Sequence, residues 1–333
     1  MSRTASEARS RATTGGWDGG GAIKLVPTFC AICGPAGEAE ELYPARLAPA
    51  AFSASVFSAR RPPDRLHYRM VRCRTCGLVR SDPVAENAVL QGLYADSLLN
   101  YEAESANLRR TYGRCLARLE RYGAVKGSLL EIGCGHGFFL EEALSQGYGS
   151  VRGVEPSRDA VAKCSRQIRP QMVCNLFRAG LFPRAVFDVL CMFQVLDHVP
   201  EPAAFLDECL DVLRPGGLAL ALNHDIQALP ARILGQRSPI IDVEHTFLYS
   251  PGTMRRLFAR RGFEVLEVHP VWNRCALQYL SRLVPLPPRA RQWVQRLLSA
   301  TGLGRIPLTV PLGNLCLIAR KPARSEPQKR SAA

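Results

Sequence analysis

The sequence lacks any long run of hydrophobic residues. A membrane-spanning helix needs about 20 consecutive apolar residues, and no segment of the chain reaches that length. Residues 1–24 also lack the continuous apolar core of a secretory signal peptide. These absences exclude a transmembrane helix and predict a soluble, cytoplasmic protein. Residues 1–24 are rich in Ser, Arg, Thr and Gly and are predicted to be disordered, and residues 323–333 form a basic tail.

Acidic side chains are in the minority. The chain has 29 Asp and Glu residues against 43 Lys and Arg residues, which gives a net charge of +14. Such an excess favours anionic partners, among them nucleotide sugars, RNA and anionic lipid surfaces. Several of the basic residues lie in the two tails, so we interpret the charge as a solvated basic surface and not as a folded basic groove.

Disulfide bonds are not expected, because the predicted location is the reducing cytoplasm. In addition, most of the 12 cysteines are scattered singly in apolar contexts. Four cysteines form two Cys-x-x-Cys-Gly motifs at residues 30–34 and 73–77. Each motif places two thiolates on a tight turn whose glycine lets N–H groups point at the sulfurs, as a structural zinc site requires. We therefore predict a zinc ribbon over residues 25–83, with an inserted segment at 42–65 and His67 as an alternative ligand. The predicted zinc ligands are Cys30, Cys33, Cys73 and Cys76.

The glycine-rich motif at residues 133–137, around which the rest of the chain is organised, lacks the last glycine of a dinucleotide-binding fingerprint. Residues 129–139 have the pattern of a buried strand that stops at Gly133, Gly135 and Gly137 and continues into a helix over 139–146. Glycines allow a sharp turn and a close approach to a ligand, and a helix start favours a carboxylate or phosphate. A dinucleotide fingerprint needs glycine where the chain has Phe138, so a nicotinamide cofactor is disfavoured.

Strands and helices alternate after residue 127. We predict strands at residues 128–132, 151–155, 172–176, 187–193, 218–223, 263–268 and 315–319, with helices between most of them. Apolar strands separated by helices indicate a largely parallel sheet covered on both faces, so the predicted fold class is α/β, a Rossmann-like seven-stranded sheet. A helical connector is predicted at 84–126, where Leu108, Tyr112 and Leu116 recur at helical spacing.

Residues 127–322 resemble the class I S-adenosylmethionine-dependent methyltransferases. Glu131 precedes the glycine motif, Glu155 ends the second strand, and residues 187–200 and 213–217 are similar to the family's fourth strand and to its turn before the fifth. The resemblance implies an enzyme, S-adenosylmethionine as cofactor, a methyltransferase sheet, and Glu155 as the acceptor for both ribose hydroxyls. The implied cofactor-binding residues are Glu131, Gly133, Cys134, Gly135, Gly137, Glu155, Phe177, Phe193 and Gln194.

The third strand departs from this family. It lacks the aspartate that often binds the adenine amino group, and Asn175 is the only polar candidate nearby. Leu176 or Phe177 is expected to pack on the adenine ring instead. The departure puts cofactor affinity or selectivity in doubt.

Residues 241–251 resemble the Glu-His segment of zinc-binding sugar C-methyltransferases. Glu244 and His245 match, whereas Asp242 stands where that group has a tyrosine. The resemblance implies a small polar acceptor, a sugar or nucleotide sugar and thus an anionic sugar derivative. An unperturbed histidine has a pKa of ~6.5 and accepts a proton near neutrality, so His245 is the candidate general base, with substrate binding as its alternative role. The predicted catalytic residues are His245, Glu244 and Asp242.

Two other functions are left open by the sequence. The zinc ribbon and its arginines would also suit an RNA methyltransferase, with nucleic acid as the partner. The missing third-strand acid would suit an inactive zinc-ribbon binding or scaffold protein. An insertion at 271–313, with an amphipathic helix near 289–300, is predicted to be a lid or dimer contact, with a membrane-leaning surface as the alternative. His136 and His198 are expected to pack or to lie beside the cofactor.

Overall fold

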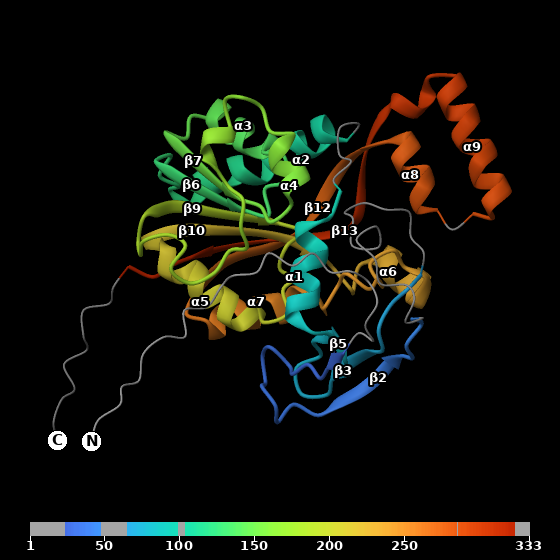
Figure 1. The fold of residues 1–333 in the computed structure, drawn as a ribbon, viewed down its shortest axis with the longest axis horizontal. Coiled ribbons are helices and arrows are strands. Elements are labelled where there is room, and N and C mark those ends of the chain that lie inside the picture. Colours follow the sequence, from blue (N-terminus) through green and yellow to red (C-terminus); the bar gives the residue numbers. More distant parts are fainter. Residues whose placement is uncertain (1–23, 48–64, 99–103, 285, 324–333) are drawn as a thin grey trace, which may run out of the picture.

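A seven-stranded sheet forms the centre of the computed structural model, which describes residues 24–47, 65–98, 104–284 and 286–323 (Figure 1). All neighbouring strands are parallel except at β13, which is antiparallel to both of its neighbours. The predicted Rossmann-like α/β fold is confirmed. The strand order across the sheet is β12 (Glu264–Ala276), β13 (Pro307–Arg320), β10 (Leu213–His224), β9 (Phe187–Phe193), β6 (Ser128–Ile132), β7 (Ser150–Val154) and β8 (Met172–Val173).

Helices cover both faces of this sheet, because its central strands are buried on both sides. In β9 every residue is buried, with Leu190 and Met192 in one hydrophobic cluster and Val189 and Cys191 in the other. One face carries α2 (Ser105–Ala117), α3 (Phe138–Ser145) and α4 (Arg158–Ala162), and the other carries α5 (Pro202–Val212) and α7 (Pro251–Arg260) (Figure 1). The short 3-10 helices are η2 (Arg118–Tyr122), η3 (Arg169–Gln171), η4 (Gly235–Arg237) and η5 (Leu303–Arg305).

Three strand predictions were too short. Strand β10 begins at Leu213, five residues before the predicted strand at 218–223. We predicted strands at 263–268 and 315–319, but β12 and β13 pair continuously, with two irregularities, from Glu264 opposite Arg320 to Ala276 opposite Pro307. The outer half of β13 is mostly exposed, and the buried positions in the outer half of β12 include Asn273, so neither half shows the apolar pattern of a core strand. This hairpin carries α8 (Leu277–Leu283) and α9 (Pro288–Ala300), which lie within the predicted insertion. Conversely, β8 is shorter than the predicted strand at 172–176.

The N-terminal part forms a second sheet of four strands. Its order is β11 (Phe247–Leu248), β4 (Val79–Ser81), β3 (Met70–Cys73) and β2 (Ala39–Tyr43), all antiparallel. Strand β11 comes from the far end of the sequence and was not predicted. A separate pair joins β1 (Leu25–Val26) to β5 (Val84–Ala85), and α1 (Asn87–Ala95) follows β5. Helix α6 (Leu229–Leu234) follows β10.

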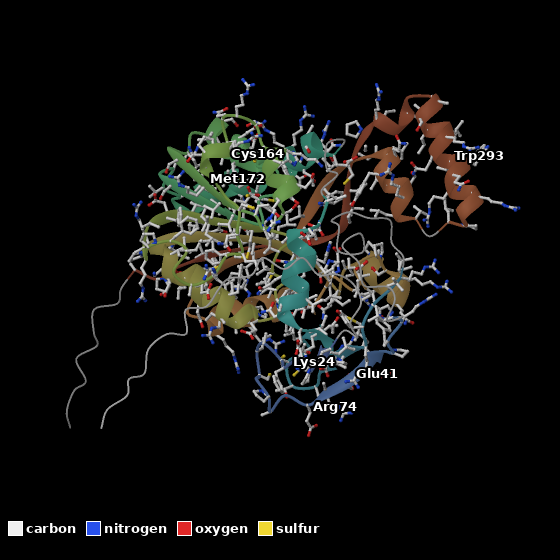
Figure 2. All side chains as sticks on the ribbon, viewed as in Figure 1. Lys24, Glu41, Arg74, Cys164, Met172 and Trp293 are labelled. Atoms are coloured by element: carbon white, nitrogen blue, oxygen red, sulfur yellow. The ribbon has the colours of Figure 1, made fainter. Side chains whose placement is uncertain are left out.

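Several predictions concern residues outside the described ranges. The predicted disordered tail and the basic tail lie almost entirely there, as does most of the segment predicted between the two cysteine motifs. Among the described helices, none is long and apolar enough to cross a membrane. Helix α9 nevertheless exposes large apolar side chains, and Trp293, which is 65% exposed, points away from the sheet (Figure 2).

Candidate active site

A cavity of about 990 Å³ lies at the carboxyl ends of the parallel strands. Its floor includes the ends of β6, β7, β9 and β10, and its walls come from α1, α6, α8 and the hairpin strand β13. This is the edge at which open α/β sheets bind ligands. Of the predicted residues, Glu131, Gly133, Cys134, Gly135, Glu155, Phe177, Phe193, Gln194, Asp242, Glu244 and His245 all line it.

The glycine loop leaves β6 in a conformation that other residues rarely adopt. Gly133, Gly135 and Gly137 have φ angles of 70°, 54° and 81°. A Cβ atom on Gly133 would lie 2.5 Å from Val195 Cγ2, and one on Gly137 would lie 2.6 Å from Ile168 Cγ2. Glycine is therefore required for both the turn and the packing, and the loop backbone lies open to the cavity at Gly133 and Gly135.

Glu155 ends β7 and closes the glycine loop from the other side. Its carboxylate accepts hydrogen bonds from the backbone N–H of Gly135 at 2.8 Å and of Ser157 at 2.9 Å. Burial raises the pKa of Glu155, and the two N–H donors partly oppose that rise by stabilising the charged form. The carboxylate is therefore held in a fixed orientation at the cavity wall.

Glu131 supplies a second carboxylate one strand away. It is 2% exposed, and among the described residues its Oε2 atom has no hydrogen-bond partner. Burial and then the neighbouring Glu155 raise the pKa of Glu131 well above its usual value. A buried carboxylate oxygen without a donor is costly, so this wall of the cavity is suited to a ligand that brings a cation or a hydrogen-bond donor.

Aromatic and amide side chains complete this half of the cavity. Phe193 stacks on Tyr112 with ring centroids 4.0 Å apart, and Phe177 makes an edge contact with Phe205. Gln194 has a positive φ of 56°, and its Oε1 atom has no hydrogen-bond partner within the described structure. Cys134 differs from expectation in one respect, because its thiol is 3.6 Å from Met172 Sδ in the core and only its backbone can serve a ligand.

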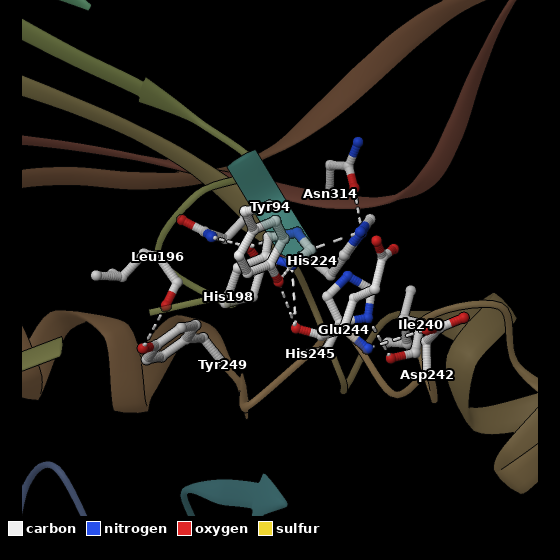
Figure 3. A network of polar contacts seen from close by, with 12 residues as sticks. Tyr94, Leu196, His198, His224, Ile240, Asp242, Glu244, His245, Tyr249 and Asn314 are labelled. Carbon is white, nitrogen blue, oxygen red and sulfur yellow. Dashed lines mark hydrogen bonds and ion pairs between the residues drawn. The ribbon is translucent and has the colours of Figure 1, made fainter. Parts of the chain in front are cut away.

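The other half of the cavity contains a cluster of three histidines around one carboxylate, here called the histidine cluster: Asp197, His198, His224 and His245. Asp197 is fully buried, with its Oδ1 atom 3.9 Å from His198 Nε2 and its Oδ2 atom 4.0 Å from His224 Nε2. The His245 ring centroid is 4.8 Å from that of His198 and 4.9 Å from that of His224 (Figure 3). His245 thus lies in the cavity with its ring against those of His198 and His224.

Hydrogen bonds orient each ring of the histidine cluster. His245 Nδ1 lies 2.9 Å from the Ile240 carbonyl and His224 Nδ1 lies 3.0 Å from Asn314 Oδ1, while His198 Nδ1 lies 3.1 Å from the Glu244 carbonyl (Figure 3). Burial, followed by the two neighbouring histidines, lowers the pKa of His245 well below its usual value. His245 is therefore neutral at physiological pH.

The other two predicted catalytic residues have different surroundings. Asp242 accepts a hydrogen bond from the Glu244 N–H at 3.0 Å, which shapes the turn before His245. Asp242 stands where the sugar C-methyltransferase segment has a tyrosine. A tyrosine from another element, Tyr94 of α1, is nevertheless near, since its hydroxyl lies 3.1 Å from His198 Nδ1. Asp197 and His224 were not selected, although His224 directly follows a predicted strand and Asp197 lies four residues beyond one, which is the signal that could have found them.

The four predicted metal ligands come together in the N-terminal sheet. The sulfur atoms of Cys30, Cys33, Cys73 and Cys76 all lie within 4.8 Å of one another. Each motif forms a tight turn, closed by hydrogen bonds from Gly34 N–H to the Cys30 carbonyl and from Gly77 N–H to the Cys73 carbonyl, each 2.8 Å long. His67 is not in this group, because its ring contacts the Tyr68 carbonyl and Gln236.

Comparison with known proteins relates part of the main sheet to a family. Residues 105–268 match the model of a family described as a methyltransferase domain. This segment of the chain is therefore similar to methyltransferase domains. The ubiquinone biosynthesis O-methyltransferase of Caulobacter vibrioides is 31% identical over 137 residues, which are 37% of this chain and 53% of that protein. An uncharacterized methyltransferase of Schizosaccharomyces pombe is 30% identical over 152 residues, or 40% of this chain and 52% of that protein.

A solved S-adenosylmethionine-dependent methyltransferase from Archaeoglobus fulgidus has 21% identity and a TM-score of 0.44, covering 64% of this chain and 94% of that one. The chain spans about half the length of the curated relatives it matches. Both the Caulobacter and the Schizosaccharomyces matches cover less than half of this chain.

The Asp, Glu, Lys, Arg and His side chains that line the cavity are mostly carboxyl groups. Among the described residues that line it, a single basic side chain of the Lys or Arg type, Arg178, stands against seven carboxyl groups. The cavity is thus acidic although the chain as a whole is basic. The seven carboxyl groups belong to Glu131, Glu155, Glu201, Glu208, Asp225, Asp242 and Glu244.

Proposed function

We propose that the protein catalyses methyl transfer from S-adenosylmethionine to a hydroxyl group of a small, uncharged acceptor. The observation that carries this proposal is that one cavity joins the glycine loop, with Glu131 and Glu155, to the histidine cluster. The first set of residues suits the donor, and the second suits an acceptor that must lose a proton. In-line transfer requires both partners in one enclosed space.

The donor half fits the cofactor. Glu155 presents a fixed carboxylate to two ribose hydroxyls, and Glu131 Oε2, which lacks a hydrogen-bond partner among described residues, would accept from the cationic end of the cofactor. When bound, S-adenosylmethionine supplies an electrophilic methyl group on a sulfonium ion. On the adenine side, Asn175 and Phe177 line the cavity where the family often has an acid, so stacking and the Asn175 amide would hold the ring.

In the acceptor half, a histidine would receive the proton that the acceptor hydroxyl loses. In His245, Nδ1 faces a carbonyl and must carry the hydrogen, so Nε2 bears the lone pair. The buried Asp197 would stabilise the imidazolium formed, since burial alone disfavours that charge. We propose His245 as this base, as the sequence indicates, with Glu244 and Asp242 setting the turn that places it.

The charge of the cavity bears on the identity of the acceptor. A nucleotide sugar carries a diphosphate, for which the described lining offers only Arg178 against seven carboxyl groups. We therefore favour an uncharged, hydroxyl-bearing acceptor over the anionic sugar derivative and over RNA. Apolar side chains at the mouth of the cavity, including Leu280, Leu283 and Leu312, would contact an apolar part of the acceptor.

We also propose that the four-cysteine cluster holds a structural zinc ion. Four thiolates on two tight turns match the tetrahedral sulfur set that zinc takes in closed structural sites. Such a site leaves no position for a reactant, so the role of zinc would be to hold the N-terminal sheet together.

The test uses the full chain and S-adenosylmethionine labelled at the methyl group, incubated with matched sets of hydroxylated acceptors: phenols, neutral sugars and nucleotide sugars. We expect transfer to an uncharged set, and loss of at least 100-fold in turnover for His245→Gln with cofactor binding retained. His269→Gln, in β12 and outside the cavity, is the matched control and should behave as wild type.

If only nucleotide sugars become labelled, the acceptor is an anionic sugar derivative and our preference for an uncharged acceptor is wrong. Full activity of His245→Gln would show that His245 is not the base. Absence of cofactor binding by calorimetry would instead favour the scaffold protein.

A further inference from the structure

We propose that Asp197, His224 and His245 form a binding site for a divalent transition-metal cation in the acceptor half of the cavity. The site is separate from the four-cysteine cluster. One ligand atom from each of the three side chains lies within 4.8 Å of the other two. Two imidazoles and one carboxylate with the remaining positions open are a recurrent ligand set for such ions, Fe²⁺ in particular.

The tautomers of both histidines favour coordination through Nε2. The Asn314 amide donates through Nδ2 to Asn273 Oδ1 at 3.2 Å, which fixes Asn314 Oδ1 as an acceptor facing His224 Nδ1. His245 Nδ1 faces the Ile240 carbonyl, which also can only accept. Both rings therefore carry hydrogen on Nδ1 and a lone pair on Nε2. Metal-binding histidines are held in this way, with the other ring N–H donated to a carbonyl or carboxylate.

The carboxylate has an oxygen whose partner is missing. Asp197 is 0% exposed; its Oδ1 accepts from Asn223 Nδ2 at 2.9 Å, whereas Oδ2 has no hydrogen-bond partner in the described part of the chain. That oxygen faces His224 Nε2 at 4.0 Å. If both rings carry hydrogen on Nδ1, neither can donate from Nε2 to this carboxylate, so a cation is the partner that would satisfy Asp197 Oδ2.

The spacing is close to what a single ion needs. Ligand atoms bound at about 2.1 Å lie roughly 3.0–3.5 Å apart around one metal ion. Asp197 Oδ2 and His224 Nε2, which are 4.0 Å apart, would therefore approach by about 0.5–1.0 Å. A pair as far apart as the 4.8 Å limit would approach by up to about 1.8 Å. His224 has a side-chain exposure of 23% and lines the cavity with His245, so an ion held here would face the acceptor space. Acceptor hydroxyl oxygen could then occupy an open position.

The role of this metal site rests on the proposed methyl transfer, whereas metal binding can be tested without it. A cation on His245 Nε2 would use the lone pair that base catalysis needs. The proposed base role of His245 therefore applies to the metal-free protein, whereas an ion held by Asp197, His224 and His245 would polarise the acceptor hydroxyl. The metal site and the transfer activity are measured separately.

The experiment titrates Co²⁺ into the full chain after zinc has been loaded into the four-cysteine cluster and free metal removed. We expect one further equivalent to bind, with weak visible absorption and no sulfur-to-metal charge-transfer band. Proton NMR of wild type should show two exchangeable, strongly shifted imidazole N–H signals, one from each Nδ1. His224→Gln should weaken binding at least tenfold, whereas the control His269→Gln should not.

The wild-type NMR signals keep the test valid if a variant folds poorly. Absence of a second equivalent, or a second equivalent with no shifted pair of imidazole signals, would overturn the site. Cofactor binding and methyl transfer without the second equivalent would leave the proposed function intact. A bound ion without any methyl transfer would support the site and remove the proposed function.

Discussion

Glu155 offers the sharpest test of the donor half of the cavity. The carboxylate already accepts two backbone N–H groups and would accept two ribose hydroxyls on its remaining lone pairs. A hydrogen bond to a charged group contributes about 1.5–3 kcal/mol. In Glu155→Gln the charge is lost and one oxygen becomes an amide donor, so we expect about 2–4 kcal/mol less binding free energy, a weakening of roughly 30- to 1000-fold.

Part of that loss would come from the loop and not from the cofactor. The new amide N–H₂ would face a backbone N–H, either of Gly135 or of Ser157, and leave it without an acceptor, which costs about 1–3 kcal/mol. Calorimetry with S-adenosylhomocysteine and with its 2′,3′-dideoxy analogue separates the two contributions, because only the first ligand has ribose hydroxyls.

We expect wild type to bind the dideoxy analogue more weakly than S-adenosylhomocysteine. Glu155→Gln should bind the two ligands with nearly equal affinity. If the variant and wild type lose the same factor between the two ligands, Glu155 does not bind the ribose. Surface variant Asp159→Asn, whose carboxylate pairs with Lys163 at 2.7 Å on α4, is the control and should bind both ligands as wild type does.

Three further predictions concern other parts of the chain. Because burial raises the pKa of Glu131, cofactor binding should release a proton; calorimetry in buffers of different ionisation enthalpy should show this release in wild type and lose it in Glu131→Gln. Hydrogen bonds from Arg118 and Tyr122 lower the pKa of Glu267 to about 2, so its ionised form stabilises the fold above its unfolded pKa of about 4.3 and this contribution is lost as the pH falls towards 2. Urea unfolding should therefore show Glu267→Gln destabilised by about 2–3 kcal/mol at pH 7, with the difference shrinking below pH 4, and Glu264→Gln, more than half exposed, little changed. Cys73→Ser should lower the metal content by one zinc per chain and the melting temperature by several degrees, and an unchanged zinc content would refute the four-cysteine site.

The donor half of the cavity was predictable because its residues lie in two short stretches at the ends of neighbouring strands. Gly133, Gly135 and Gly137 are needed for the turn itself, and Glu155 ends the next strand, so local sequence places them at one edge of the sheet. The strands of the sheet core were equally visible, since β9 is apolar at nearly every position.

The acceptor half was only partly predictable, because its members come from four separate segments. His245 was found through its resemblance to a known segment, but His224 ends a strand whose partner Asn314 lies 90 residues away. Asp197 was passed over because it lies four residues beyond the predicted strand at 187–193, and its burial becomes visible only in the structure. The outer halves of β12 and β13 were missed because that part of β13 is mostly exposed, and because the buried positions of β12 there include the polar Asn273.

The N-terminal sheet is part of the framework of the active site. Its strand β4 pairs with β11, and the Ser81 N–H donates to the Thr246 carbonyl at 2.8 Å while the Ser81 hydroxyl donates to the His245 carbonyl at 2.9 Å. Thr246 N–H in turn donates to the Asp197 carbonyl at 2.8 Å. A short chain of hydrogen bonds therefore runs from the N-terminal sheet through residues 245–247 to the backbone of Asp197, whose side chain belongs to the histidine cluster.

The same sheet is also anchored to the methyltransferase domain through α7. The Arg256 guanidinium donates to the Cys76 carbonyl at 2.9 Å, and Arg260 donates to the Ile32 carbonyl. Both carbonyls belong to the cysteine turns, so the order of those turns is transmitted to α7, which begins three residues after β11. A metal ion in the four-cysteine cluster would thereby help to fix the backbone of His245 and Asp197. The four-cysteine cluster has no open coordination position, so this effect on backbone position is how its metal ion would influence methyl transfer.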